Sequence, residues 1–252
     1  NANLYFALDI DEFNIKTSSN NTFMTDKFVL PNENTAALGT TKIMKYHLKS
    51  NYVATVRAAL LAKDLEFIEI DQMPVQEESH LKSSPMGKVP YIETEKGTLT
   101  EVNVIFDYLE EIAPNPALYP RDPWERAKAK EIGRISELYI DGASRPLTKA
   151  AYFGETVSDQ IKEFCKPEIK KGVGALLRLG NFEEGFIAGK ELTFSDITTY
   201  FQIGFARVCT AKIYDWDIVK ENEPIQNYLD RLEETSSIAT AAKIMNDSLK
   251  SA

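Results

Sequence analysis

The chain has 252 residues, a net charge of −9 and a sequence pI of about 5.0, with 43% hydrophobic and 27% charged residues. This length and composition provide material for one large or two small globular domains. The acidic balance argues against a nucleic-acid-binding protein. Because no apolar run approaches the roughly 18 residues that span a bilayer, no membrane segment is expected either.

The residues that usually carry catalysis or bind metals are sparse. Cys165 and Cys209 lie far apart, which fits inert free thiols in a reducing compartment better than a disulfide scaffold. The sequence has two histidines and lacks HExxH, GxSxG, GxGxxG, GxxxxGK[ST] and CxxC. No metal site is therefore expected.

Residues 1–41 are polar and turn-rich and show no helical periodicity. We expect them to form a leader or extension outside the core. The opening "NANLYFA" is similar to a protease-site remnant, which is consistent with an expression tag making up part of this segment.

The first regular elements form a strand–helix–strand unit. Residues 42–48 alternate like a strand, and 66–70 form a second strand. Between them, Val53, Val56 and Leu60 share one helical face. This spacing predicts a βαβ unit with two parallel strands, followed by a looser, partly helical segment around "VQEESHLK".

A β-hairpin and an amphipathic helix come next. Residues 89–94 and "GTLT" are predicted strands, with Gly97 supplying the turn. Pro90 fits a strand start because it lacks a backbone donor. Residues 101–112 carry a clean apolar helical stripe. The segment 113–123, with four prolines, predicts a linker of restricted geometry.

Everything beyond the linker is predicted to be helical. One helix is expected over 124–144, with Tyr139 on its apolar face, and another begins near Pro167. Thr193 and Asp196 form a variant of the capping box at the start of a third helix. A final amphipathic helix begins at Pro224. We therefore predict a small α/β domain followed by an all-α domain.

Four segments, in order, resemble a cytosolic glutathione transferase of the serine type. They are "SNYVATVRAALLAKDLEF", "SSPMGKVPYI", "LTEVNVIFDYLEE" and "FIAGKELTFSDI", and the resemblance covers about 42–235. It implies a thioredoxin-like glutathione-binding domain at 42–112, the linker at 113–123 and an all-helical domain at 124–252. It also implies a cytoplasmic homodimer that takes glutathione as its co-substrate.

The resemblance further implies where glutathione binds. The Val89 backbone pairs with the cysteinyl part of glutathione next to a cis bond at Val89-Pro90, like a borrowed strand. Glu101 accepts the γ-glutamyl ammonium, and Lys88 meets the glycine carboxylate. Val102 replaces the family's usual serine, so only its backbone N–H remains to hold the γ-glutamyl carboxylate.

Asn103 is a candidate to compensate for the hydroxyl that Val102 lacks. Glu101 has a simpler alternative role, as an acidic residue favoured by the helix dipole.

Ser50 is the catalytic candidate because it lies seven residues before Arg57, the spacing of the nucleophile-activating residue in the family. A hydroxyl donor aimed at sulfur, next to a helix N-terminus, stabilises the thiolate. Its alternative role is that of a simple N-cap. Tyr46 and Tyr52 are rival hydroxyls, and Asn51 occupies the family's usual proline position.

The implied activity is transfer of glutathione to a small hydrophobic electrophile, or reduction of a peroxide, in detoxification. The alternative is a non-catalytic binding or assembly module with the same fold, which Asn51 and Val102 favour. We expect the electrophile site between the two domains. Its candidate lining residues are Arg134, Tyr139, Phe205 and Tyr214.

Overall fold

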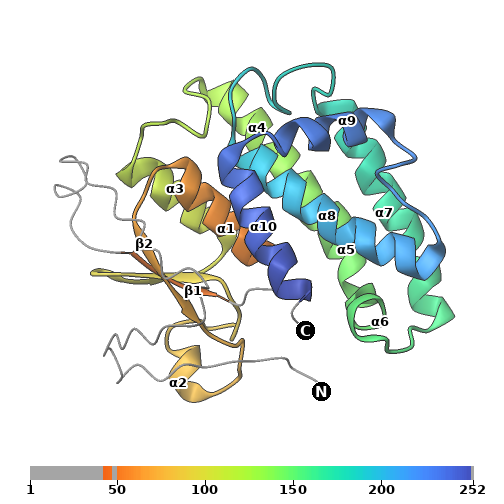
Figure 1. The fold of residues 1–252 in the computed structure, drawn as a ribbon, viewed down its shortest axis with the longest axis horizontal. Coiled ribbons are helices and arrows are strands. Elements are labelled where there is room, and N and C mark those ends of the chain that lie inside the picture. The colour runs from red at the N-terminus through yellow and green to blue at the C-terminus, as the bar shows by residue number, and fades with distance from the viewer. Residues whose placement is uncertain (1–41, 47–49, 251–252) are drawn as a thin grey trace.

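The computed structural model describes residues 42–46 and 50–250 (Figure 1). The expectation for residues 1–41 lies outside the described residues, as do positions 47–49 of the first predicted strand. Among the described residues, no helix is both long and apolar enough to cross a membrane.

A four-stranded sheet organises the first part of the chain. Its strands are β1 (Lys42–Tyr46), β2 (Phe67–Asp71), β3 (Tyr91–Thr94) and β4 (Gly97–Leu99), in the order β2-β1-β3-β4. β1 pairs with β2 in parallel, whereas the β1–β3 and β3–β4 pairs are antiparallel. The predicted βαβ unit and the hairpin that follows are therefore confirmed.

Three helices accompany the sheet: α1 (Asn51–Ala62), α2 (Glu78–Leu81) and α3 (Val102–Ile112). Figure 1 shows α1 and α3 together on one side of the sheet and α2 on the other. The remaining elements are α4 (Pro123–Ile135), the π-helix η2 (Ser136–Asp141), α5 (Gly142–Ser144), the 3₁₀ turn η3 (Arg145–Leu147), α6 (Thr148–Phe153), α7 (Asp159–Leu179), α8 (Phe194–Tyr214), α9 (Glu223–Leu232) and α10 (Ser236–Lys250).

α1 lies at the centre of the molecule. It packs against α3 on one side and against α8 and α10 on the other. Val53, Val56 and Leu60 are fully buried, as their shared helical face predicts. The faces of α1 turned away from α3 are covered by α8 and α10, so this helix joins the sheet layer to the helical layer. The thioredoxin-like sheet layer and the all-helical remainder confirm the predicted fold class.

The predicted helix over 124–144 is interrupted. η2 inserts a π-helical stretch at Ser136–Asp141, where the wider turn rotates the following side chains relative to an α-helix. Tyr139 is consequently 55% exposed, whereas Ile132 remains buried. The expectation that Tyr139 shares the apolar face with Ile132 was wrong for this reason.

The helix expected to begin near Pro167 begins earlier. α7 starts at Asp159, after Ser158, whose side chain accepts a hydrogen bond from the Ile161 backbone at 3.3 Å. Pro167 lies inside α7 on its exposed side, where water can satisfy the carbonyl that loses its partner. A good cap thus sets the start of the helix.

The capping box at the start of α8 is confirmed. Asp196 accepts from the Thr193 backbone at 2.8 Å and is fully buried. It also accepts from the Ile187 backbone and from the Tyr228 hydroxyl, both at 2.7 Å. Thr193 and Asp196 therefore have the structural role expected of them.

Candidate functional site

Ser50 is the N-cap of α1. Its backbone is extended, at φ −88° and ψ 125°, and its Oγ accepts a long hydrogen bond of 3.4 Å from the Val53 N–H. The side chain is half-buried. This placement sets a hydroxyl at the positive end of a helix, where it favours a nearby anion. The N-cap role is therefore present, and it leaves the O–H hydrogen of Ser50 available to a ligand.

The segment before β3 is held in a fixed turn. Ser84 Oγ accepts from the Lys88 N–H at 3.0 Å and donates to the Lys88 carbonyl at 2.7 Å. Gly87 has φ +62°, and a Cβ there would lie 2.4 Å from the Val75 carbonyl oxygen, so the turn requires glycine. The Val89-Pro90 bond is cis, as predicted. The Lys88 side chain is exposed, and Val89 is half-buried.

The register of the sheet brings the candidate segments to one end. Lys45 pairs with Tyr91, and Ile92 pairs with Leu99. Continuing the two registers beyond these pairs leads Val89, Pro90 and Glu101 to the end of the sheet at which β1 finishes, and Ser50 follows the last residue of β1, Tyr46, four positions later in the sequence. The backbone thus gathers the catalytic candidate and the binding candidates in one region.

Glu101 precedes α3 with an unusual backbone, at φ 66° and ψ 118°. Non-glycine residues rarely adopt positive φ, and such residues are common at ligand sites. Its side chain is exposed, whereas Val102 is buried. The turn therefore presents the Glu101 carboxylate outward at the start of a helix.

Asn103, the candidate to compensate for the missing serine hydroxyl, contacts the helical layer. Its amide donates to Glu137 Oε2 in η2 at 2.7 Å. The same carboxylate pairs with Arg134 Nη1 at 2.6 Å. Asn103 thus ties α3 to the helical layer, since at least one of its amide hydrogens is already used.

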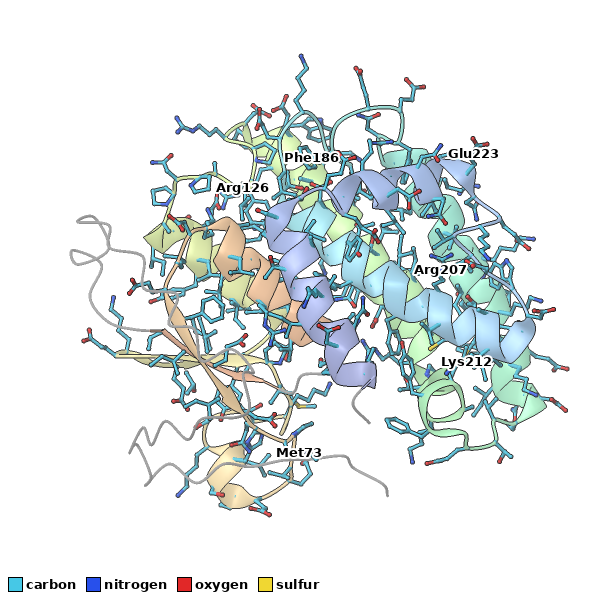
Figure 2. All side chains as sticks on the ribbon, viewed as in Figure 1. Met73, Arg126, Phe186, Arg207, Lys212 and Glu223 are labelled. Atoms are coloured by element: carbon cyan, nitrogen blue, oxygen red, sulfur yellow. The ribbon has the colours of Figure 1, made fainter. Side chains whose placement is uncertain are left out.

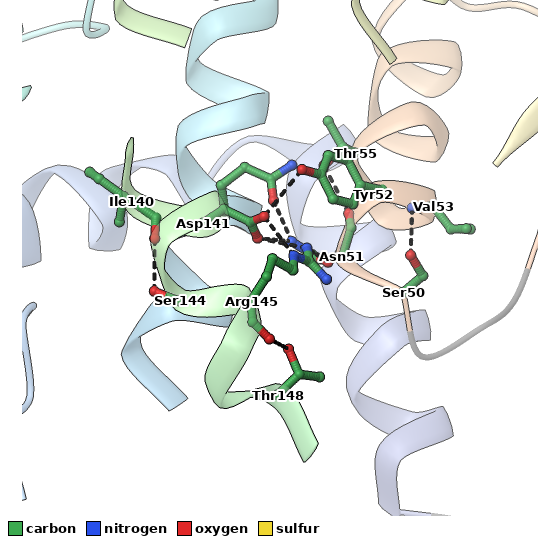
Figure 3. A network of polar contacts seen from close by, with 11 residues as sticks. Ser50, Asn51, Tyr52, Val53, Thr55, Ile140, Asp141, Ser144, Arg145 and Thr148 are labelled. Atoms are coloured by element: carbon green, nitrogen blue, oxygen red, sulfur yellow. Dashed lines mark hydrogen bonds and ion pairs between the residues drawn. The ribbon is translucent and has the colours of Figure 1, made fainter. Parts of the chain in front are cut away.

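A polar network connects the start of α1 with the helical layer (Figure 3). Asn51 Nδ2 donates to Asp141 Oδ1 at 2.9 Å and also to Gln202 Oε1. Tyr52 OH donates to Asp141 Oδ2 at 3.1 Å. Arg145 donates to both oxygens of Asp141, each at 2.7 Å, and to Asn51 Oδ1 at 2.8 Å.

Sequence reasoning missed Asp141, Arg145 and Gln202. The available signal was the i,i+4 pairing of Asp141 with Arg145 inside the otherwise apolar stretch "LYIDGASRPL".

The network also engages the hydroxyl of Tyr52, one of the two rivals to Ser50. Burial, together with the neighbouring Asp141 charge, raises the pKa of Tyr52 well above its ordinary value. Because its O–H is committed to Asp141, Tyr52 is a poor donor for a thiolate. The Tyr46 side chain lies outside the described part of the structure. Of the two rivals to Ser50, the described contacts therefore argue against Tyr52 alone, and Ser50 stays the predicted catalytic residue.

Aromatic side chains pack beside this network. The Arg145 guanidinium lies 3.9 Å from the Phe205 ring centroid and 4.8 Å from that of Tyr52. Tyr152 stacks on Phe205 with centroids 5.4 Å apart. Of the expected electrophile-site residues, Phe205 therefore lies close to the start of α1.

The other expected electrophile-site residues lie elsewhere or are engaged. Tyr139 is exposed, Arg134 pairs with Glu137, and Tyr214 OH donates to the Lys162 carbonyl at 2.9 Å. A surface groove of about 730 Å³, lined in part by Trp124 and residues 187–193, contains none of the site candidates.

Neither cysteine resembles a reactive thiol. Cys165 and Cys209 are free and buried. Burial raises the pKa of Cys209 to about 12, and it raises that of Cys165 as well. Within the described residues, no cluster of histidine, cysteine and carboxylate side chains has the make-up of a metal site.

The fold and this site define a two-layer protein with a thioredoxin-like half and a helical half, as in the glutathione transferases. A family model described as "Glutathione S-transferase, N-terminal domain" matches residues 37–117. A glutathione S-transferase from Pseudomonas putida is 35% identical over 198 residues, covering 79% of this chain and 88% of the relative. The chain belongs to the glutathione S-transferase family.

Two further relatives are more distant. A probable maleylacetoacetate isomerase 1 from Drosophila melanogaster is 29% identical over 198 residues, covering 75% of this chain and 79% of that protein. The crystal structure of a glutathione S-transferase from Methylobacterium radiotolerans, in complex with glutathione sulfonate, superposes with a TM-score of 0.66 at 21% identity. It covers 80% of this chain and 94% of that one. The last likeness concerns the fold alone.

Proposed function

We propose that the protein is a glutathione transferase that activates the glutathione thiol with Ser50. The observation that carries this proposal is the gathering of Ser50, Val89 and Glu101 at one end of the sheet, with Ser50 at the N-terminus of α1. Membership of the family supports the co-substrate. The proposed reaction is conjugation to a small hydrophobic electrophile or reduction of a peroxide.

Each binding candidate has a proposed contact with glutathione. The Val89 backbone pairs with the cysteinyl part, beyond the paired residues of β3. Glu101 accepts the γ-glutamyl ammonium, and the Val102 N–H at the start of α3 donates to the carboxylate. Lys88, whose side chain is exposed, meets the glycine carboxylate. We propose the domain boundaries given above, 42–112 and 124–252, for the two halves that form the site.

The chemistry of Ser50 follows from the thiol. A free thiol titrates near pH ~8.5, so at neutral pH most glutathione is protonated and weakly nucleophilic. A hydroxyl that donates to sulfur, at the positive end of α1, favours the thiolate. In a conjugation by substitution, the thiolate forms a bond to the electrophilic carbon while the bond to a leaving group such as halide breaks, and the thiol proton passes to solvent.

A second candidate reaction is isomerisation of a double bond through transient addition of glutathione. The observation in its favour is the relative named as a probable maleylacetoacetate isomerase. The thiolate adds to a conjugated double bond and is later expelled, so the same Ser50 role serves both reactions.

Two assays test the proposed function against a non-catalytic module. Retention on immobilised glutathione measures binding, and conjugation to a generic aryl halide measures transfer. A conjugated cis-alkene acid tests isomerisation. If the protein is retained but turns over neither the aryl halide nor the alkene acid, the non-catalytic alternative is supported. If the protein is not retained, the proposed glutathione site has no basis.

Glu101→Gln tests the γ-glutamyl contact. The substitution keeps the shape of a side chain at φ 66° but removes its charge. We expect the KM for glutathione to rise about tenfold with little change in kcat, since the lost contact serves the ground and transition states equally. Initial rates at varied glutathione concentration check this, and an unchanged KM would contradict the assignment.

We also propose a two-fold homodimer in the cytoplasm. Exposed apolar side chains, Val104 on α3 and Trp124 on α4, are 48% and 73% exposed in the single chain, which suits burial against a partner. Light scattering at micromolar concentration is expected to give twice the chain mass of 28.4 kDa. A mass equal to one chain would show that the dimer does not form.

A further inference from the structure

A buried and heavily hydrogen-bonded group outside the proposed glutathione contacts is the carboxylate of Asp141. It is fully buried and accepts four hydrogen bonds: from Asn51 Nδ2, Tyr52 OH, Arg145 Nε and Arg145 Nη2. Two of these donors are the first two residues of α1. Asp141 itself ends η2 in the helical layer, about 90 residues away in sequence.

Asn51 is held from three helical elements. Its amide group contacts Asp141 of η2, Arg145 of η3 and Gln202 of α8. Asn51 is buried and directly follows Ser50. Figure 3 shows the Asp141 and Arg145 side chains converging with Asn51 at the first turn of α1. The helical layer therefore holds the residue that directly follows Ser50.

We propose that Asp141 and Arg145 are positioning residues for thiol activation: they hold the start of α1 through Asn51 and keep the charge beside Ser50 balanced. This rests on the proposed function of Ser50. Neither residue needs to touch glutathione, because Asn51 and Tyr52 transmit the effect of Asp141 to the backbone that carries Ser50.

The charge balance gives the proposal a distinctive signature. Asp141 and Arg145 form a forked ion pair, so their fields at the thiol largely cancel. The other titratable groups facing the pair are Tyr52 of α1, Tyr152 of α6 and Cys209 of α8. Glu137 of η2 and Lys212 of α8 lie one step further out, facing Tyr52 and Cys209. Removing one member of the pair unmasks the charge of the other. Replacing a residue that only maintains the fold would not shift the thiol pKa in a direction set by the charge removed.

The expected result is therefore a pair of opposite shifts in the pKa of the bound glutathione thiol. Asp141→Asn leaves the guanidinium of Arg145 uncompensated and lowers this pKa. Arg145→Gln leaves the Asp141 carboxylate uncompensated and raises it. Each shift is expected to be about 0.5–1 pH unit, the size for one charge roughly 10 Å away at an effective dielectric constant above 20. The double variant is expected to return close to the unchanged protein.

The measurement is the ultraviolet absorbance of the bound thiolate against pH, with folding of each variant checked by circular dichroism. Asp217→Asn is the matched control, because it removes the acidic half of the forked Arg207–Asp217 pair elsewhere in the helical layer. It is expected to leave the thiol pKa unchanged. If Asp141→Asn fails to fold, Arg145→Gln still decides: an unchanged or lowered thiol pKa overturns the proposal.

A second readout needs no glutathione. The Ala54 N–H bonds to the Ser50 carbonyl at 3.0 Å, in the first turn of α1. Loss of the Arg145 contacts is expected to speed hydrogen exchange in this turn about tenfold, and unchanged exchange would overturn the positioning role. If the unchanged protein neither binds nor conjugates glutathione, the proposed function fails and the thiol-activation role fails with it. If it is active but both variants shift the pKa alike, only the inference fails.

Discussion

Replacing Ser50 with alanine is expected to slow conjugation about ten- to hundredfold at neutral pH and to leave glutathione affinity nearly unchanged. A hydrogen bond to a charged sulfur contributes roughly 1.5–3 kcal/mol, and each ~1.36 kcal/mol changes a rate tenfold. Affinity is spared because Val89, Glu101 and Val102 hold the two ends of the tripeptide in the proposed site. Initial rates with an aryl halide at saturating glutathione measure the loss.

The pH dependence separates activation of the thiol from a general loss of structure. The Ser50 contact favours the thiolate, so it matters most below the free thiol's pKa of about 8.5. Above that pH solvent already supplies the thiolate, and the difference between Ser50→Ala and the unchanged protein is expected to shrink. Full activity of the variant at pH ~6.5 would falsify the assignment.

Ser158→Ala is the matched control for the N-cap role. Ser158 caps α7 with a side-chain hydrogen bond of 3.3 Å, close to the 3.4 Å of the Ser50 cap. Either substitution is expected to cost about 0.5–2 kcal/mol of stability through the lost cap. Only Ser50→Ala is expected to reduce turnover. Ser50→Cys is expected instead to form a mixed disulfide with glutathione, which mass spectrometry detects.

The elements predicted correctly are those that local patterns determine. The α3 stripe, the hairpin with a positive φ at Gly97 and the Thr193–Asp196 capping box each depend on residues a few positions apart. The turn itself lies at 95–96, and Gly97 already begins β4. The predicted helix start near Pro167 was wrong because the cap at Ser158 begins α7 earlier, and the helix continues through Pro167. Regular periodicity likewise gave no sign of the π-helix at Ser136–Asp141.

Candidate site residues within local sequence motifs could be named from the sequence, whereas contacts between side chains far apart in the sequence could not. Ser50, Val89 and Glu101 come from three segments whose gathering follows from strand order and register. Asp141 and Gln202 reach Asn51 across 90 and 151 residues, and no local pattern specifies such a contact. The roles of the site residues remain predictions until they are tested.

A second set of long-range contacts involves Lys63, the residue that follows α1. Its side chain is buried and forms an ion pair with Glu110 of α3. It also donates to the carbonyls of Ala113 and Pro116 in the linker, at 2.9 and 2.8 Å. Glu110 in turn accepts from the backbone N–H groups of two further linker residues, Leu118 and Tyr119. The pair thus joins the end of α1, α3 and the linker.

Lys63→Met is expected to destabilise the protein by about 3–5 kcal/mol, because it leaves the buried Glu110 carboxylate without its cation. Chemical denaturation followed by circular dichroism measures the free energy of unfolding. Lys171→Met, which removes the largely exposed partner of Glu168 in α7, is the control and is expected to cost under about 0.5 kcal/mol. Equal losses in the two variants would show that the buried pair has no special role.

Adding Glu110→Gln to Lys63→Met separates the charge from the shape of the pair. The amide oxygen can take the place of Oε1, which accepts from the Tyr119 N–H, while the NH₂ group takes the place of Oε2 on the side of Lys63 and its linker carbonyls; the Leu118 N–H then loses its acceptor. With the unpaired charge removed, about 1–3 kcal/mol of the loss is expected to return, the cost of one unsatisfied buried polar group. Since α1 carries Ser50 at its other end, any loosening of this joint is expected to lower turnover as well as stability. A double variant no more stable than Lys63→Met would place the cost in the lost linker hydrogen bonds instead of in the buried charge.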